Sequence, residues 1–153
     1  MPDAGALVRA TDIAVPAPAE GIPHAPVIVF DDGIVQVTAV AVTHGRAVPA
    51  LAYRFRTPEG SVAFSGDTAV NEDLIGLARG ADILVHQVAD LDHLKRHGTD
   101  DAELDRMAAL HTDVTQVGGV AERARARELI LSHYLPAGRD GLRRMLPRRE
   151  HGH

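Results

Sequence analysis

Residues 65–88 read SGDTAVNEDLIGLARGADILVHQV, and this stretch decides the fold class. It opens with a polar, glycine-containing turn over residues 65–68, and Asn71 is a residue type that caps helices. Apolar residues then recur at helical spacing until Gly80, a residue type that commonly ends a helix. The continuous apolar run 83–85 is typical of a buried strand. The stretch therefore predicts a turn, a helix and a strand in succession, which indicates α/β layering.

The sequence before this stretch predicts three strands. Residues 35–42 (VQVTAVAV) alternate apolar side chains with polar or small ones, as a half-buried strand does. Residues 52–57 and 61–64 follow the same pattern, and Pro58, Glu59 and Gly60 between them are typical of a turn. These two strands are therefore expected to form a hairpin.

The sequence after it predicts helices over residues 102–110, 114–126 and 138–146, and a short buried strand over 128–132. Residues 89–101 are rich in Asp, which indicates an exposed and partly helical segment. Because hairpin strands come first and strand–helix units follow, the order predicts an α/β fold with a mixed sheet flanked by helices.

Length and composition limit the domain count and the function classes. A chain of 153 residues with 45% hydrophobic content suffices for one domain. We expect a Pro/Ala-rich leader or linker over 1–26, a domain over 27–147 and a disordered tail over 148–153. The net charge of −5 and the 3% aromatic content exclude a broad basic field and a stacking platform for nucleic acid. Without a signal-peptide pattern or a long apolar run, a cytoplasmic protein that does not contact membranes is expected.

The chain has nine histidines and no cysteine. Disulfides and thiolate metal sites are therefore excluded, and any metal site must use imidazole and carboxylate donors. His44, Asp67 and His133 each follow an expected strand, where sheet proteins often assemble sites. Two imidazoles and a carboxylate suit Zn²⁺, Mn²⁺ or Fe²⁺. A hydrogen-bonding surface His and an Asx turn explain the same residues, so the spacing leaves both interpretations open.

Residues 65–88, together with ALHTDVTQVGGVAERARARELILSHYLP (109–136), resemble the carboxyl-terminal half of a metallo-β-lactamase-fold hydrolase. The resemblance is closest to the ribonuclease Z-like branch with its related phosphodiesterases and arylsulfatase-like enzymes, and it spans about residues 35–136. The segment 42–55 is similar to the one that carries the third metal-binding motif there. The resemblance implies half of a four-layered αββα sandwich, with one edge or face of the sheet left exposed.

The resemblance also implies roles for four residues. His44 would bind one metal, Asp67 would bridge two metals, and His133 would bind the second. A complete site in this family holds two Zn²⁺ ions, which lower the pKa of a shared water until hydroxide is available. His111, followed by Thr112, matches a His-Ser/Thr pair that assists the leaving group. A protonated His111 would neutralise charge on the leaving oxygen.

Two departures from the family pattern affect this expectation. The H-x-H-x-D-H cluster that supplies most ligands does not occur in the 153 residues, and Gln87 stands where many relatives have Glu. Each metal would keep only two protein ligands, whereas a catalytic zinc normally has three. We therefore expect either a fragment or a site that something else completes.

The resulting function hypothesis is a metal-dependent hydrolase of phosphodiester or related ester bonds, with a small-molecule or a nucleic-acid substrate. The alternative is an inactive remnant that serves as a metal-binding or protein-interaction module. Either would pair with a second copy or a complementing chain through the exposed sheet. A third, weaker hypothesis is a metal-buffering surface around residues 89–101.

The other histidines and the arginines carry weaker expectations. His93 and His97 stand four residues apart, where a solvated surface is favoured over a metal pair. His86 lies in an apolar strand and is expected to be a core residue, whereas His151 and His153 belong to the tail. The arginines of the carboxyl third favour a solvated helix face over a phosphate-binding surface.

Overall fold

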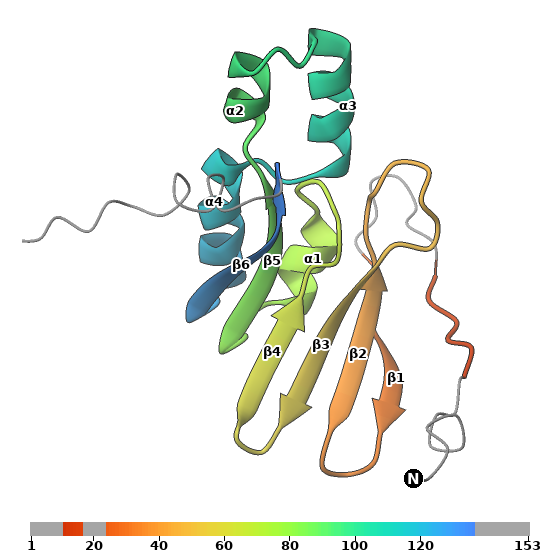
Figure 1. Ribbon diagram of the computed structural model, residues 1–153. Coiled ribbons are helices and arrows are strands. Elements are labelled where there is room, and N and C mark those ends of the chain that lie inside the picture. Colours follow the sequence, from red (N-terminus) through yellow and green to blue (C-terminus); the bar gives the residue numbers. More distant parts are fainter. Residues whose placement is uncertain (1–10, 17–23, 137–153) are drawn as a thin grey trace, which may run out of the picture.

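A computed structural model describes residues 11–16 and 24–136, and its core is one six-stranded sheet in the order β1-β2-β3-β4-β5-β6. Figure 1 shows the strands with four helices around them. The strands are β1 (Val27–Asp31), β2 (Gln36–Ala41), β3 (Leu51–Thr57), β4 (Gly60–Phe64), β5 (Ile83–Ala89) and β6 (Glu128–Leu135). The helices are α1 (Glu72–Leu77), α2 (Leu91–Arg96), α3 (Asp101–Leu110) and α4 (Val114–Ala124).

The sheet is mixed, as expected. Strands β1 to β4 pair antiparallel with their neighbours, whereas β4, β5 and β6 pair parallel. Strand β2 therefore runs in the same direction as β4, β5 and β6. Their carboxyl ends meet at one end of the sheet, and Figure 1 shows α2 and α3 beyond that end.

Each helix begins at a side chain that caps it. The Asn71 side chain accepts a hydrogen bond from the Leu74 amide, which confirms the helix start predicted from the sequence. Asp90, Asp100 and Asp113 accept from backbone amides at the starts of α2, α3 and α4. Such a cap stabilises a helix by about 1 kcal/mol, because it satisfies an amide that has no partner within the helix.

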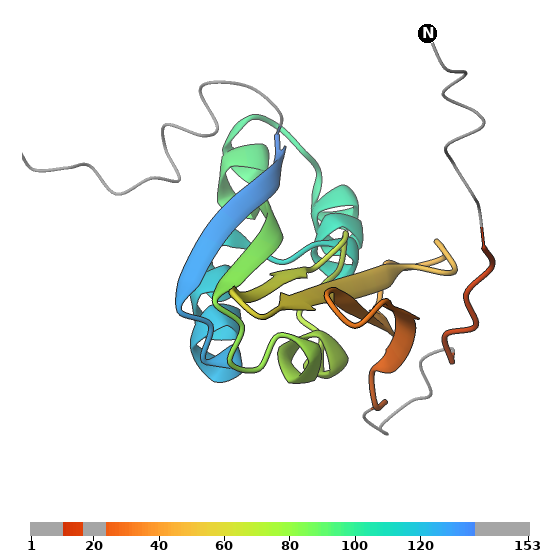
Figure 2. The same ribbon diagram turned by 90° about the horizontal axis from the view of Figure 1, so that it is seen from below.

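The core lies between one face of the sheet and the helices α1 and α4, which Figure 2 shows on the same side. Alternate residues of the strands point to this face and are almost fully buried. They pack against Leu74, Ile75 and Leu77 of α1 and against Val120 of α4. The strand residues of this core include Val40, Ala52, Ala63 and Leu84.

The opposite face carries apolar side chains that stay exposed. Tyr53, Phe64, Val85 and Ile130 lie side by side across four strands, since their Cα atoms are partners in the ladder. Phe55, Phe64 and Ile130 are 39%, 42% and 46% exposed, although they are large and apolar. We call this surface, defined by these five residues, the open face. The expected exposed face of the sheet is confirmed within the described residues.

Several sequence expectations differ from the structure in detail. The strand β1 was not expected, because its apolar side chains point to both faces and leave no alternation with polar ones. The expected helix 138–146, the tail and most of the leader lie outside the described residues. Among the helices of the described part, none is long and apolar enough to cross a membrane.

Candidate metal centre

Four side chains gather at the carboxyl end of the sheet: His44, Asp67, His111 and His133. His44 follows β2, Asp67 follows β4, and His111 ends α3. The ring centroids of His44 and His111 are 5.1 Å apart, and those of His111 and His133 are 6.3 Å apart. His133 Nε2 lies 3.6 Å from Asp67 Oδ2. The structure thus brings together all four residues that the sequence singled out.

A bulge in β6 positions His133. The sequence predicts that His133 follows the strand, but this is wrong because β6 continues to Leu135. In the ladder with β5, Gln87 pairs with Ser132 and Val88 pairs with Tyr134, so His133 has no partner. Its φ of 44° lies in the left-handed region, which costs a non-glycine residue about 1–3 kcal/mol. Bulges commonly re-aim a side chain next to a site, and this one is at the candidate metal centre.

His44 is oriented by a backbone carbonyl. Its Nδ1 lies 3.0 Å from the carbonyl oxygen of Leu110 at the end of α3. A carbonyl oxygen only accepts hydrogen bonds, so Nδ1 carries the proton and neutral His44 keeps its lone pair on Nε2. Metal-binding histidines commonly donate their other nitrogen in this way. The tautomer of His44 therefore suits a metal ligand.

Asp67 stands on a tight turn after β4. Gly66 has a φ of 60°, and a Cβ there would lie 2.5 Å from the carbonyl oxygen of Leu51. Glycine is therefore required at this position. On the other side of Asp67, the Thr68 carbonyl accepts from Gln87 Nε2 at 2.7 Å and from Thr112 Oγ1 at 3.0 Å. The backbone around Asp67 is thus fixed, while its side chain stays 36% exposed.

His111 is buried, at 7% exposure, and its Nδ1 lies 3.0 Å from Gln87 Oε1. Burial lowers the pKa of His111, and the neighbouring His44 lowers it further, while Asp67 partly opposes the shift. Since an unperturbed His has a pKa of about 6.5, His111 is mainly neutral at pH 7. The lowered pKa favours the neutral form of His111, whereas the role that the resemblance implies uses the protonated form.

Sequence reasoning missed three groups that hold these residues: the Leu110 carbonyl, the Thr68 carbonyl and the side-chain amide of Gln87. Backbone carbonyls carry no signal in a sequence. The sequence marks Gln87 only as a departure from the family pattern, whereas in the structure its side chain contacts His111 directly.

The remaining histidines in the described part do not join this centre. His86 is fully buried, as expected, and burial lowers its pKa. The rings of His93 and His97 stack at 3.9 Å. His24 contacts Asp73 of α1 through its backbone amide at 2.7 Å and its ring Nδ1 at 3.1 Å. His151 and His153 lie outside the described residues.

The donors at the centre have the right chemistry for zinc but make an incomplete set. Imidazole nitrogen and carboxylate oxygen are common zinc ligands, and the tautomer of His44 fits. In residues 11–16 and 24–136, however, no group of three or more His, Asp or Glu side chains is arranged to hold a metal ion. A catalytic zinc normally has three protein ligands. An ion at Asp67 and His133 therefore needs further donors.

A groove of about 420 Å³ opens beside His44, between the loop after β2 and the helix α3. Arg46 and Arg106 line it together with Leu110, and Arg106 forms an ion pair with Glu103. The groove gives a substrate room next to the candidate metal centre, with positive charge in its lining.

Most of the chain, including all four residues of the candidate metal centre, matches a known family. Residues 5–134 match the profile described as a beta-lactamase superfamily domain. The chain belongs to the beta-lactamase superfamily. The match begins at residue 5, upstream of the start that the resemblance indicated. The domain boundaries drawn from the sequence stay a prediction.

Curated relatives agree with this membership. The chain is 28% identical over 131 residues to ribonuclease Z of Mycobacterium tuberculosis, covering 86% of this chain and 47% of that protein. It is 38% identical over 84 residues to the uncharacterized protein Rv1339 of the same species, covering 54% of this chain and 27% of that protein. The chain thus spans about half the length of the ribonuclease Z proteins that it matches.

Two solved structures share the fold. The short form of human tRNase Z superposes with a TM-score of 0.54 at 23% identity, covering 71% of this chain and 39% of that chain. The metallo-beta-lactamase fold protein YhfI from Bacillus subtilis superposes with a TM-score of 0.56 at 22% identity, covering 81% of this chain and 46% of that chain. The expected fold is therefore confirmed: the mixed sheet with its helices is a portion of the metallo-β-lactamase fold.

Proposed function

We propose that this protein is part of a metal-dependent hydrolase of phosphodiester or related ester bonds. The observation that carries the proposal is the gathering of His44, Asp67, His111 and His133 at one end of the sheet. Membership of the superfamily and the similarity to ribonuclease Z support the reaction class.

Three residues would hold the metal. Asp67 would bridge two ions, with Nε2 of His44 on one side and His133 on the other. When bound, two divalent cations supply a hydroxide near neutral pH and stabilise charge on the attacked group. Zn²⁺ suits these donors best, and Mn²⁺ or Fe²⁺ also accepts imidazole and carboxylate.

The protein's own residues orient these groups. The Leu110 carbonyl fixes the ring of His44, and Gly66 allows the turn that presents Asp67. The ring centroid of His111 lies 5.1 Å from that of His44 and 6.3 Å from that of His133, and its Nε2 would take part in moving a proton at the leaving oxygen. The small groove and the net charge of −5 favour a compact substrate over a long polyanion.

The further metal ligands would come from a second sheet that packs on the open face. The open face is apolar, and its strands end at the candidate metal centre, so a sheet laid on it would bring its own strand ends to the same place. Sedimentation velocity of the wild type and of Phe64→Asp identifies the source. A dimer lost in the variant means that a second copy supplies the sheet, and a monomer in both means that another polypeptide segment does.

The test of the reaction class is hydrolysis of bis-p-nitrophenyl phosphate in the presence of Zn²⁺ or Mn²⁺. The proposal predicts metal-dependent turnover that Asp67→Ala abolishes. Turnover equal to that of Asp67→Ala would contradict catalysis by this chain alone.

A second candidate function is a metal-binding or protein-interaction module without catalysis. The incomplete donor set in the described residues favours it, since two ligands bind an ion without activating it for hydrolysis. Zinc binding that depends on Asp67, without turnover, is the result that this candidate predicts.

A further inference from the structure

The side chain of Gln87 forms hydrogen bonds at both of its ends, although it is only 1% exposed. Its Nε2 donates to the Thr68 carbonyl at 2.7 Å, and its Oε1 lies 3.0 Å from Nδ1 of His111. Its backbone amide donates to Ser65 Oγ at 3.1 Å. Gln87 therefore joins the loop that carries Asp67 to the ring of His111.

These contacts determine which nitrogen of His111 carries the proton. The Thr68 carbonyl only accepts, so the NH₂ end of the Gln87 amide must face it, and the amide oxygen must face His111. That oxygen also only accepts, so Nδ1 of His111 must donate. In the neutral ring, the lone pair is then on Nε2, across the ring from Gln87.

We propose that Gln87 is a positioning residue that holds His111 as the Nδ1–H tautomer and so makes Nε2 its working nitrogen. The use of Nε2 rests on the proposed function, whereas the tautomer rests on the hydrogen bonds alone. His44 is held in the same way by the Leu110 carbonyl. The two rings, 5.1 Å apart, thus both keep their lone pair on Nε2.

Glutamine suits this position better than glutamate. After the substitution Gln87→Glu, the new carboxylate would still accept from Nδ1 of His111, but it has no proton to donate to the Thr68 carbonyl 2.7 Å away. Two oxygens would then face each other in a buried place, which costs free energy. The amide is the form of this side chain that satisfies both neighbours.

The experiment is a long-range ¹H–¹⁵N spectrum of the imidazole rings in the uniformly ¹⁵N-labelled 153-residue protein. For the wild type, the proposal predicts the Nδ1–H pattern for His111, assigned by its loss in His111→Gln. In Gln87→Met, which removes the acceptor at similar size, the resonances should move toward the mixture of tautomers seen for an exposed His.

Gln87→Glu separates the tautomer from simple packing. It should keep the Nδ1–H pattern, since the carboxylate accepts, while lowering the melting temperature because the Thr68 contact is lost. Gln116→Glu introduces the same negative charge at an exposed position of α4 and is the control. It should change neither the Nδ1–H pattern of His111 nor the melting temperature. An Nε2–H pattern in the wild type, or an unchanged Nδ1–H pattern in a folded Gln87→Met, would overturn the proposal. Neither result depends on turnover, so failure of the proposed function would be seen separately.

Discussion

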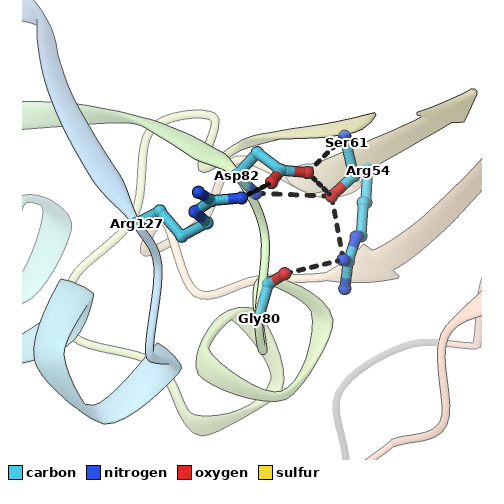
Figure 3. A network of polar contacts seen from close by, with 5 residues as sticks. All are labelled: Arg54, Ser61, Gly80, Asp82 and Arg127. Carbon is cyan, nitrogen blue, oxygen red and sulfur yellow. Dashed lines mark hydrogen bonds and ion pairs between the residues drawn. The ribbon is translucent and has the colours of Figure 1, made fainter. Parts of the chain in front are cut away.

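The two ends of the sheet differ in how closely their polar side chains are joined to one another. At the amino ends of β4, β5 and β6, Arg54, Ser61, Asp82 and Arg127 form one network, which Figure 3 shows together with Gly80. At the carboxyl ends, Asp67 stays 36% exposed and lies 3.6 Å from His133, beyond hydrogen-bond distance. The contacts at the amino end stabilise the fold, whereas Asp67 and His133 at the carboxyl end keep oxygen and nitrogen atoms available as metal ligands.

The network at the amino end connects the sheet to the end of α1. Arg54 donates to the carbonyls of Arg79 at 2.8 Å and Leu77 at 3.2 Å, and to Ser61 Oγ at 3.0 Å. Asp82 accepts from the Ser61 amide at 2.8 Å and from Arg127 at 3.1 Å. The Ser61 amide is the main cause that lowers the pKa of Asp82, and the Arg127 hydrogen bond adds to it.

The carboxyl end also contains one residue with an unfavourable backbone conformation. His133 has a left-handed φ of 44° in a bulge, whereas Gly66 adopts its positive φ before Asp67 without strain because it is a glycine. Local strain of this kind persists where the surrounding structure holds it, and it is common at functional sites. The comparison teaches that the polar network and the proposed metal centre lie at opposite ends of the sheet, so variants should affect stability or zinc affinity separately.

The largest effect on stability alone is expected for Arg54→Met. It removes a charged donor from the carbonyls of Leu77 and Arg79 and from Ser61, which should lower the free energy of unfolding by about 2 kcal/mol. Urea unfolding measures the change. Arg56→Met is the matched control, because Arg56 is exposed on the same strand. Equal stability of the two variants would contradict the role of the network, and zinc affinity should stay unchanged in both.

A loss of stability together with a loss of zinc affinity is expected for Gly66→Ala. The left-handed φ costs an alanine about 1–2 kcal/mol, and its Cβ would press against the Leu51 carbonyl. Because the turn presents Asp67, zinc titration should show weaker binding as well. Gly76→Ala, with no heavy atom near the added Cβ, is the control. An unchanged zinc affinity in Gly66→Ala would show that the turn does not position Asp67.

The smallest of these effects is a pH dependence from His86. Burial lowers the pKa of His86 in the folded state, so the unfolded chain binds a proton first as the pH falls. Stability should therefore decrease as the pH drops below about 6.5, the pKa of an exposed His, and continue to fall down to the folded pKa. Melting curves from pH 7.5 to 5 should show a weaker decline in His86→Leu than in the wild type. An equal slope in both proteins would assign the decline to other groups.

The strands and helices were largely predictable because their patterns are local. The alternation in 35–42, the turn at Pro58 and the cap at Asn71 all correspond to observed elements. The site residues His44, Asp67 and His111 were predictable from the resemblance, as was His133. Their geometry was not, because it depends on contacts between distant parts of the chain.

The missing parts of the prediction have identifiable causes. The bulge at His133 arises in the ladder between β5 and β6, where a sequence gives no register. The tautomers of His44 and His111 are set by the Leu110 carbonyl and by the Gln87 amide, 66 and 24 residues away along the chain. Gln87 could be recognised as unusual in an apolar strand, but only the structure shows that it joins His111 to Thr68.

The central claim is that the carboxyl end of the sheet binds metal through Asp67, and calorimetric titration with Zn²⁺ tests it most directly. The titration compares the wild type with Asp67→Asn and with Asp82→Asn, an identical change at the opposite end. The account predicts that Asp67→Asn weakens zinc binding by more than about tenfold, since loss of a ligand costs more than loss of a supporting contact. Asp82→Asn should bind zinc as the wild type does. Equal affinities for the wild type and Asp67→Asn would contradict the account.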